Sequence, residues 1–298
     1  MRLLLQWIGM SVVWMMLAGM GGFVHAEESC GRIRAFVSVL PQVYFVERVG
    51  GSRVVVDTLV QPGQDPHTYT PTPRQVAALA EAQLFFRVGM PFEENLMPKL
   101  AGIMERIHVV DLRQGILVQD SIGHDHHAHE EGHHEGEPDP HIWMNPMHVK
   151  HMAALIRDSL ILLDPSGTDL YEKNFRAFAD DLDGLHGRIS KVLAPLAKRT
   201  IFVFHPAYGY FADAYGLVQK AVEAGGKEPL PRHLYGLIRK AKKDGVRVVF
   251  VQPQFSRKSA ATIAKAINGV VLPLDPLAKD YMKNMEEMAE KVEEALRE

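Results

Sequence analysis

The chain has 298 residues, of which 47% are apolar and 23% charged, and this ordinary globular composition excludes a disordered tail, a collagen-like repeat and a coiled-coil rod. Lys and Arg number 33 against 36 Asp and Glu, so no general basic field exists to hold nucleic acid, and we expect no nucleic-acid partner. The chain also has 15 histidines against one cysteine. This excess of imidazole side chains indicates metal binding.

The first 26 residues have the pattern of a secretory signal peptide. They contain Arg2 but no Asp or Glu, run apolar from about Leu3 to Val24, and end in Val24-His25-Ala26. The small residues Val24 and Ala26, at positions −3 and −1 relative to the cut, favour cleavage after Ala26. The alternative is a permanent membrane anchor, because the run approaches the roughly 20 residues that a spanning helix needs. We expect a cleaved, soluble periplasmic protein, in which the single Cys30 allows no internal disulfide.

Strand-like and helical runs alternate along both halves of the remaining chain, which predicts parallel sheets and an α/β fold of two similar lobes. Strands are expected at Ile33–Val37, Val54–Val60, Leu84–Val88 and Ile107–Leu112 in the first half, and at Thr200–Phe204, Leu217–Glu223, Val246–Val251 and Val270–Leu274 in the second. Helices are expected at 74–82, 93–103, from about Pro146, and at 208–215, 234–243 and 259–267.

A long helix is expected between the two halves. Apolar residues recur every three or four positions from Leu170 to Leu193, which fits one helix of about 25 residues or roughly 38 Å. Asp169 and Glu172 form a candidate capping box at its start. We interpret this helix as a rigid connector. The chain then divides into a signal peptide (1–26), an N-terminal lobe (27–165), a linker helix (166–197) and a C-terminal lobe (198–298).

Four ligand-type side chains stand beside prolines, three of them just beyond expected strands. Ligands of parallel α/β sheets bind at the carboxyl ends of the strands, and proline holds its neighbour extended. Taken singly, each histidine reads as a surface residue and the aspartate as a helix cap, but together they form a candidate metal site. Three imidazoles and one carboxylate suit tetrahedral Zn²⁺, whereas Mn²⁺ favours more oxygen. The candidate ligands are His67, His141, His205 and Asp275.

Six segments of the chain, in order, resemble the metal-binding solute receptors of bacterial zinc and manganese ABC importers. The resemblance implies two Rossmann-like lobes joined by a long rigid helix, with the metal in a cleft between them and His67, His141, His205 and Asp275 as its ligands. It also implies a membrane permease as partner. The matching segments are Gln64–Tyr69, Asp139–Trp143, Phe204–Phe211, Gly226–Pro229, Val251–Phe255 and Leu274–Leu277.

The resemblance also bears on which metal is bound. Manganese receptors of such families typically have a carboxylate where this chain has His205, whereas zinc receptors have histidine, so this chain follows the zinc pattern. Some zinc receptors have Glu directly before the first ligand histidine, where this chain has Pro66. Asp275 then becomes the expected fourth ligand, with water as its competitor.

The stretch from Val118 to Pro140 contains six histidines and seven acidic residues, with no Lys or Arg. Such a tract attracts divalent cations without fixed geometry, so we expect an auxiliary, weak metal loop, the alternative being a solvated acidic loop. Within it, residues 129–133 match the H-E-x-x-H pattern of zinc proteases, but that mechanism needs a rigid helix and the match lies in glycine-rich sequence. The loop histidines are His124, His126, His127, His129, His133 and His134.

These observations predict an exported, monomeric zinc receptor that presents Zn²⁺ to an ABC importer and catalyses no reaction. A manganese receptor is the alternative within the same family. Two other classes stay open: an exported zinc-dependent hydrolase, and a zinc buffer or surface adhesin in which the histidine-rich loop matters more than the cleft.

Overall fold

A computed structural model describes residues 31–104, 106–120, 138–223, 231–255 and 257–297. The expected signal peptide with its cleavage site, Cys30 and all six loop histidines lie outside these ranges. Within the described ranges no helix is long and apolar enough to cross a membrane. The described residues from Arg32 onward form one compact unit.

The first lobe is built on a four-stranded parallel sheet of order β2-β1-β3-β4. Its strands begin within a residue of the expected positions, and they end either at the expected residue, as β1 does, or one or two residues earlier. They are β1 (Ile33–Val37), β2 (Val54–Thr58), β3 (Leu84–Arg87) and β4 (His108–Asp111). The helices that accompany the sheet are α1 (Leu40–Gly50), α2 (Pro73–Ala80), α3 (Pro91–Leu96), α4 (Ala101–Met104) and α5 (Pro146–Leu163).

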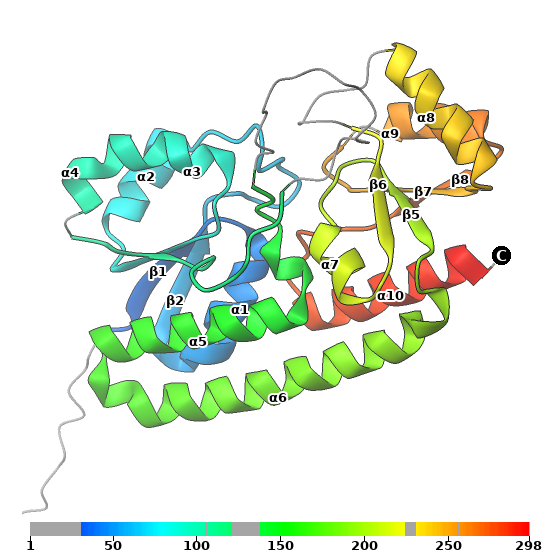
Figure 1. The fold of residues 1–298 in the computed structure, drawn as a ribbon. Coiled ribbons are helices and arrows are strands. Elements are labelled where there is room, and N and C mark those ends of the chain that lie inside the picture. The colour runs from blue at the N-terminus through cyan, green and yellow to red at the C-terminus, as the bar shows by residue number, and fades with distance from the viewer. Residues whose placement is uncertain (1–30, 105, 121–137, 224–230, 256, 298) are drawn as a thin grey trace, which may run out of the picture. The chain divides into compact units, whose positions relative to one another are not determined.

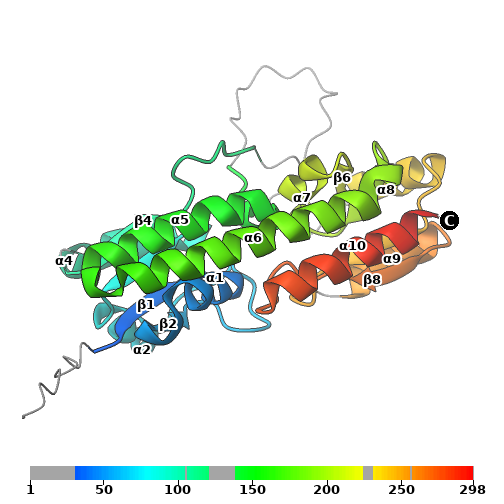
Figure 2. The same cartoon turned by 90° about the horizontal axis from the view of Figure 1, so that it is seen from below.

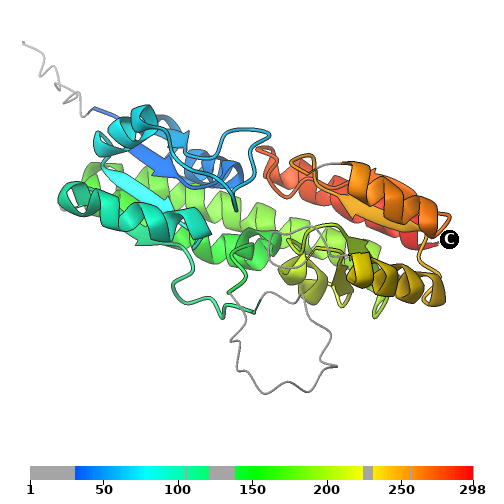
Figure 3. The same cartoon turned by 90° about the horizontal axis from the view of Figure 1, so that it is seen from above.

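The second lobe repeats this arrangement with a parallel sheet of order β6-β5-β7-β8. Seen from above, the two sheets occupy opposite halves of the described unit (Figure 3). The strands are β5 (Thr200–Val203), β6 (Val218–Ala221), β7 (Val248–Val251) and β8 (Val270–Pro273). The helices are α7 (Gly209–Ala214), α8 (Pro231–Lys243), α9 (Arg257–Ala266) and α10 (Tyr281–Arg297).

Helix α6 (Thr168–Leu193) is the long helix expected from the sequence, with 26 residues. It packs against α1 and α5 of the first lobe and against α10 of the second, and runs beneath both (Figures 1 and 2). Its buried residues keep the expected helical spacing: Tyr171, Phe178, Ala179, Leu182, Leu185, Ile189 and Leu193. The predicted fold class, two parallel α/β lobes joined by a long helix, is therefore confirmed.

The capping box expected at Asp169 and Glu172 is wrong. The helix begins at Thr168, so its N-cap is Gly167, two residues before Asp169, and this residue has no side chain to accept a hydrogen bond. Thr168 instead donates its hydroxyl to the carbonyl of Pro165 at 2.7 Å, which continues a 3₁₀ turn (Pro165–Gly167) directly into the helix. Asp169 lies in the first turn, where a negative charge stabilises the helix dipole.

One apolar core runs through both lobes. It includes residues of the first sheet such as Phe86, the buried face of α6, and Tyr281, Met285 and Met288 of α10. The ring of Tyr281 meets Phe45 of α1 edge-on at 5.0 Å between centroids. A second, smaller core, which includes Val249 and Ile263, lies between the second sheet and its helices. The two sheets are thus held on one continuous hydrophobic base.

A buried ion pair fixes the turn between α5 and α6. The guanidinium of Arg53 makes two hydrogen bonds, of 2.6 and 2.9 Å, to the carboxylate of Asp164. Asp164 also accepts hydrogen bonds from Ser166 and from the buried hydroxyl of Tyr171. Its side chain is only 5% exposed. The hydrogen bonds from Arg53 hold the pKa of this carboxyl well below its ordinary value, so it is ionised at neutral pH.

Candidate metal centre

Three of the four candidate ligands come together between the lobes. The Nε2 atom of His67 lies 3.3 Å from Nε2 of His141 and 3.0 Å from Nε2 of His205. Nitrogen ligands around a tetrahedral Zn²⁺ with Zn–N bonds of about 2.0–2.1 Å are about 3.3 Å apart. The two distances from His67 therefore already match the spacing around a single zinc ion, and all three ligand atoms lie within 4.8 Å of one another.

Two copies of the sequence Asp-Pro-His present two of these rings. His67 follows Asp65 in the loop after β2, and His141 follows Asp139 just before a 3₁₀ turn (Ile142–Met144). In both copies the Asp carboxylate accepts a hydrogen bond from the backbone N–H of the histidine two residues later, at 2.9 and 3.0 Å. Such a turn over proline fixes the backbone at the ligand.

His205 comes from the other lobe, two residues beyond the end of β5. Strand β5 lies in the interior of its sheet, and the N–H of Phe204 continues the pairing to the Phe250 carbonyl at 2.7 Å. Pro206 then stops the strand pairing. The ring of His205 is 4% exposed and stacks on Phe255 with 5.0 Å between centroids.

Buried carboxylates hold two of the rings by their other nitrogen. Nδ1 of His141 lies 2.6 Å from Oδ1 of Asp139, and Nδ1 of His205 lies 3.3 Å from Oε1 of Glu223. Both carboxylates are 3% exposed. An ionised carboxylate only accepts hydrogen bonds, so it keeps the proton on Nδ1 and leaves the Nε2 lone pair free for a metal.

We expect Asp139→Asn to weaken zinc binding about 10- to 100-fold, because outer partners of this kind orient a ligand and raise its basicity. Glu223→Gln is expected to cost less, since its contact of 3.3 Å is longer than the 2.6 Å contact of Asp139. Competition with a chelator of known affinity measures both. Equal affinities for Asp139→Asn and the parent protein would contradict the role assigned to Asp139.

The environment keeps the imidazoles of His67 and His205 neutral. Burial, together with the neighbouring His141 and His205, lowers the pKa of His67 to about 2. Burial also lowers the pKa of His205, against the opposing effect of Glu223. Metal ligation requires the unprotonated ring, so the cluster is ready to accept a cation at neutral pH.

Asp275 does not join the three histidines among the described residues. Its Oδ1 atom accepts hydrogen bonds from Gln254 Nε2 at 3.1 Å and from the Leu277 N–H at 2.9 Å. The sheet order explains the separation, because β7 lies between β5 and β8. Two strand spacings of about 4.8 Å place His205 and Asp275 roughly 10 Å apart at the sheet edge.

The strand between those that precede His205 and Asp275 contributes two glutamines to the site. Gln252 and Gln254 follow β7 and line a cavity of about 10 Å³ together with the three histidines. Their Oε1 atoms are buried and have no hydrogen-bond partner among the described residues. A space of this size holds about one water molecule. Such a water would donate hydrogen bonds to the two Oε1 atoms.

Three residues of the site were not predicted from the sequence: Glu223, Gln252 and Gln254. Glu223 was expected inside a strand, but β6 ends at Ala221, so its side chain follows a strand end like that of His205. The two glutamines follow β7 in the same way. Applied to every strand of the second sheet, the strand-end rule would have found all three.

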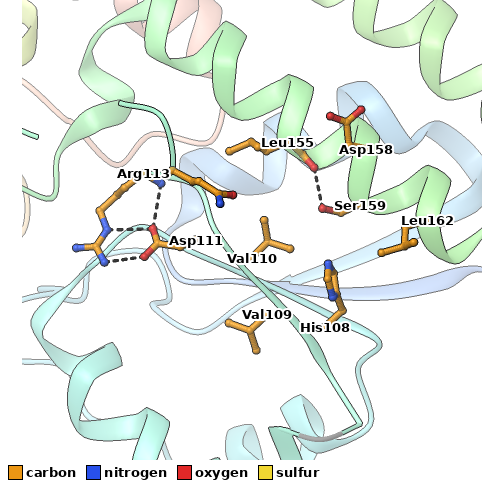
Figure 4. A pocket seen from close by; sticks show the side chains of 10 residues that line it. His108, Val109, Val110, Asp111, Arg113, Leu155, Asp158, Ser159 and Leu162 are labelled. Carbon is orange, nitrogen blue, oxygen red and sulfur yellow. Dashed lines mark hydrogen bonds and ion pairs between the residues drawn. The ribbon is translucent and has the colours of Figure 1, made fainter. Parts of the chain in front are cut away.

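A wider hollow of about 830 Å³ lies elsewhere, between β4 and α5 (Figure 4). Its charged groups pair with one another: Arg113 Nη2 lies 2.7 Å from Oδ2 of Asp111. Although burial opposes it, hydrogen bonding by Arg113 and Arg87 lowers the pKa of Asp111 to about 2. Among the described residues, the side chains placed to hold a metal ion together are the three histidines between the lobes, and none of them lines this hollow.

Two parallel α/β lobes on one long helix, with three imidazoles converging between them, two of them buried, define the class of two-lobed metal-binding receptors. Residues 36–295 match the family described as "Zinc-uptake complex component A periplasmic", ZnuA. The chain therefore belongs to the ZnuA family, the metal-binding solute-binding proteins of ABC importers.

Individual relatives agree with this assignment. The high-affinity zinc uptake system protein ZnuA of Yersinia pestis is 29% identical over 260 residues, covering 80% of this chain and 81% of its own. A crystal structure of ZnuA is 38% identical, covers 89% of this chain and 99% of its own, and has a TM-score of 0.81. A zinc-bound ZnuA deletion mutant is 39% identical, covers 89% and 98%, and has a TM-score of 0.80.

The predicted family and the predicted zinc receptor function are thereby confirmed, with Zn²⁺ as the bound ligand, and the manganese alternative is not favoured.

Proposed function

We propose that this protein captures one Zn²⁺ ion between its lobes with His67, His141 and His205 and delivers it to the membrane permease of an ABC-type zinc importer. The observation that carries the ligand assignment is the approach of the three Nε2 atoms, at 3.0 and 3.3 Å. Burial, which lowers the pKa of His67 and that of His205, supports it further.

The site supports binding rather than catalysis. Members of the family are solute-binding receptors. A hydrolytic zinc site needs a metal-bound water that can reach a substrate, together with a general base. Here the cavity beside the histidines measures about 10 Å³, which leaves no room for a peptide or an ester. Incubation of the zinc-loaded protein with generic peptide and ester substrates tests this proposal, and turnover that needs His67 would overturn it.

The family places the protein outside the cytoplasm. We propose, more specifically, that the chain is exported by a signal peptide cleaved after Ala26 and acts as a soluble periplasmic monomer. N-terminal sequencing of protein recovered from the periplasmic fraction tests the cleavage site. A mature chain that begins elsewhere, or that stays in the membrane fraction, would contradict it.

Trp143 provides a direct test of the zinc site. The full chain has three tryptophans, and Trp7 and Trp14 lie in the expected signal peptide. The ring of Trp143 is fully buried and lies 5.3 Å from that of His141. Titrating the mature chain with Zn²⁺ against a chelator is expected to show one tight site that changes Trp143 emission, followed by weaker sites. Weak binding alone, with unchanged emission, would reject the cleft site.

Deleting residues 121–137 separates the receptor from a zinc buffer. A receptor keeps its one tight site after the deletion and loses only the weak sites that the six loop histidines are proposed to form. A buffer or adhesin that depends on the loop would lose its binding altogether.

Asp275 was predicted as the fourth ligand, whereas its hydrogen bonds favour a place outside the ligand set, and Asp275→Asn distinguishes the two. We expect less than about a tenfold loss of zinc affinity, below the range that is typical of groups acting on a metal site. The physical reason is that the carboxylate is committed to Gln254 and to the Leu277 N–H. A loss comparable to that of His67→Ala would show instead that Asp275 moves onto the ion.

A further inference from the structure

Tyr210 connects the two lobes directly behind the histidine cluster. It belongs to α7 of the second lobe, is 1% exposed, and donates its hydroxyl to the carbonyl of Asp139 at 3.0 Å. The hydroxyl oxygen of Tyr210 in turn accepts a hydrogen bond from the N–H of Gln119 at 2.9 Å. Gln119 and Asp139 belong to the first lobe and pair with each other through Asp139 N–H and Gln119 O at 2.8 Å.

This position links two of the proposed ligands by a short path. Asp139 holds the His141 ring by a contact of 2.6 Å to Nδ1. Tyr210 follows His205 by five residues in the chain. The segment that carries His205 therefore holds Asp139, the residue that orients His141, by a contact across the boundary between the lobes.

Contacts around the hydroxyl make the connection stiff. The Cα of Gly209 is so close to Asp139 that a Cβ built on it would lie 3.0 Å from the second carboxylate oxygen. On the other side, the ring of His148 packs edge-on against the Tyr210 ring at 5.2 Å. Gln119 is also tied to α7 a second time, by its Nε2 to Asp213 at 3.1 Å.

We propose that Tyr210 is a positioning residue for zinc: its hydroxyl holds Asp139, and with it His141, at the correct distance from His205, and thereby slows the release of the ion. The inference rests on the proposed three-histidine site. Metal sites tolerate displacements of only about 0.5 Å, so loosening one fastener between the lobes disturbs the nitrogen spacing before it disturbs the fold.

The expected result for Tyr210→Phe is a zinc dissociation rate about tenfold higher, at the low end of the effects of outer-sphere partners. Stopped-flow mixing of the zinc-loaded mature protein with excess chelator measures this rate. The visible spectrum of the Co²⁺-loaded protein gives a second readout, because it responds to ligand geometry and is insensitive to a uniform loss of stability.

Tyr215→Phe is the matched control. Tyr215 directly follows α7, is 6% exposed, and its hydroxyl has no hydrogen-bond partner among the described residues. This variant removes the same atom from a similarly buried ring, so we expect parental zinc release and an unchanged Co²⁺ spectrum. Equal rates for Tyr210→Phe and Tyr215→Phe would overturn the proposal.

Two further variants keep the test decisive. Gly209→Ala places a methyl group against Asp139 and leaves the Tyr210 hydroxyl in place, and it is expected to speed zinc release. It provides the test if Tyr210→Phe fails to fold. Combining Tyr210→Phe with Asp139→Asn is expected to give less than the product of the two single effects, because both act on the orientation of His141. Independent, multiplying effects would contradict the pathway through Asp139.

The outcome also distinguishes this inference from the function on which it rests. A parental protein without a tight zinc site, or with one that survives His67→Ala, would reject the three-histidine site itself. A tight, His67-dependent site that Tyr210→Phe and Gly209→Ala leave unchanged would reject only the role of Tyr210.

Discussion

Replacing His67 by alanine is expected to weaken zinc binding by roughly 100- to 1000-fold. Structural zinc sites with four ligands have apparent binding free energies of about 10–16 kcal/mol, or roughly 2.5–4 kcal/mol per ligand, and each 1.4 kcal/mol is a factor of ten. His67 is the suitable ligand to remove because both short Nε2 contacts, at 3.3 and 3.0 Å, involve its ring. Chelator competition measures the affinity.

His108→Ala is the control for this prediction. His108 is an exposed histidine in β4, on the wall of the wide hollow and outside the metal cluster. Its removal is expected to leave the tight zinc site intact. If His67→Ala bound zinc as tightly as His108→Ala, the three-histidine assignment would fail, whatever the total number of zinc ions bound.

Arg53→Met is expected to destabilise the fold by about 3 kcal/mol at pH 7, because it leaves the ionised Asp164 buried without its cation. The estimate is at the low end for buried pairs, since the Arg53 side chain is 33% exposed and Ser166 and Tyr171 still donate to Asp164. Urea unfolding of the metal-free protein measures the loss and excludes any contribution from zinc.

The pH dependence of this loss has a definite sign. The folded protein holds the pKa of Asp164 below its unfolded value. The stability that this carboxylate contributes is therefore fully present above the unfolded pKa of about 3.9 and is lost as the pH falls through the folded pKa. We expect the difference between Arg53→Met and the parent to be constant near neutrality and to shrink below about pH 4.

A double variant provides the control. Adding Asp164→Asn to Arg53→Met removes the unpaired charge and is expected to recover part of the lost stability, because an amide is less costly to bury than a carboxylate. If the double variant were less stable than Arg53→Met alone, the Asp164 charge would not be the cause of the destabilisation.

Local features of this fold could be predicted from the sequence because they depend on residues close in the chain. All eight strands begin within two residues of the expected positions, since β-branched and aromatic runs mark buried parallel strands. Proline beside each candidate ligand correctly indicated the strand ends at β5 and β8. The N-cap of α6 was misplaced by two residues, because the chain enters the helix directly from a 3₁₀ turn and no side chain caps it.

The lateral order of strands explains what the sequence could not predict at the metal centre. Asp275 was expected beside His205 because both follow strands of one sheet. The sequence gives no sign that β7 separates β5 from β8, and this order leaves Gln252 and Gln254 between the two side chains. The partners of the histidine rings, Asp139 and Glu223, were not predicted either, although the sequence Asp-Pro-His places Asp139 two residues before the ring that it holds.

The position of α10 has a consequence for the way this protein is made. Its first residue, Tyr281, packs on Phe45 of α1 and donates its hydroxyl to the carbonyl of Trp143 at 2.8 Å. Part of the core of the first lobe is therefore supplied by α10, which follows every strand of both sheets in the chain. The first lobe stays open on this side until α10 has been synthesised and can dock. Truncation at residue 280 would then leave the first lobe as well as the second incompletely folded and exposed to proteolysis.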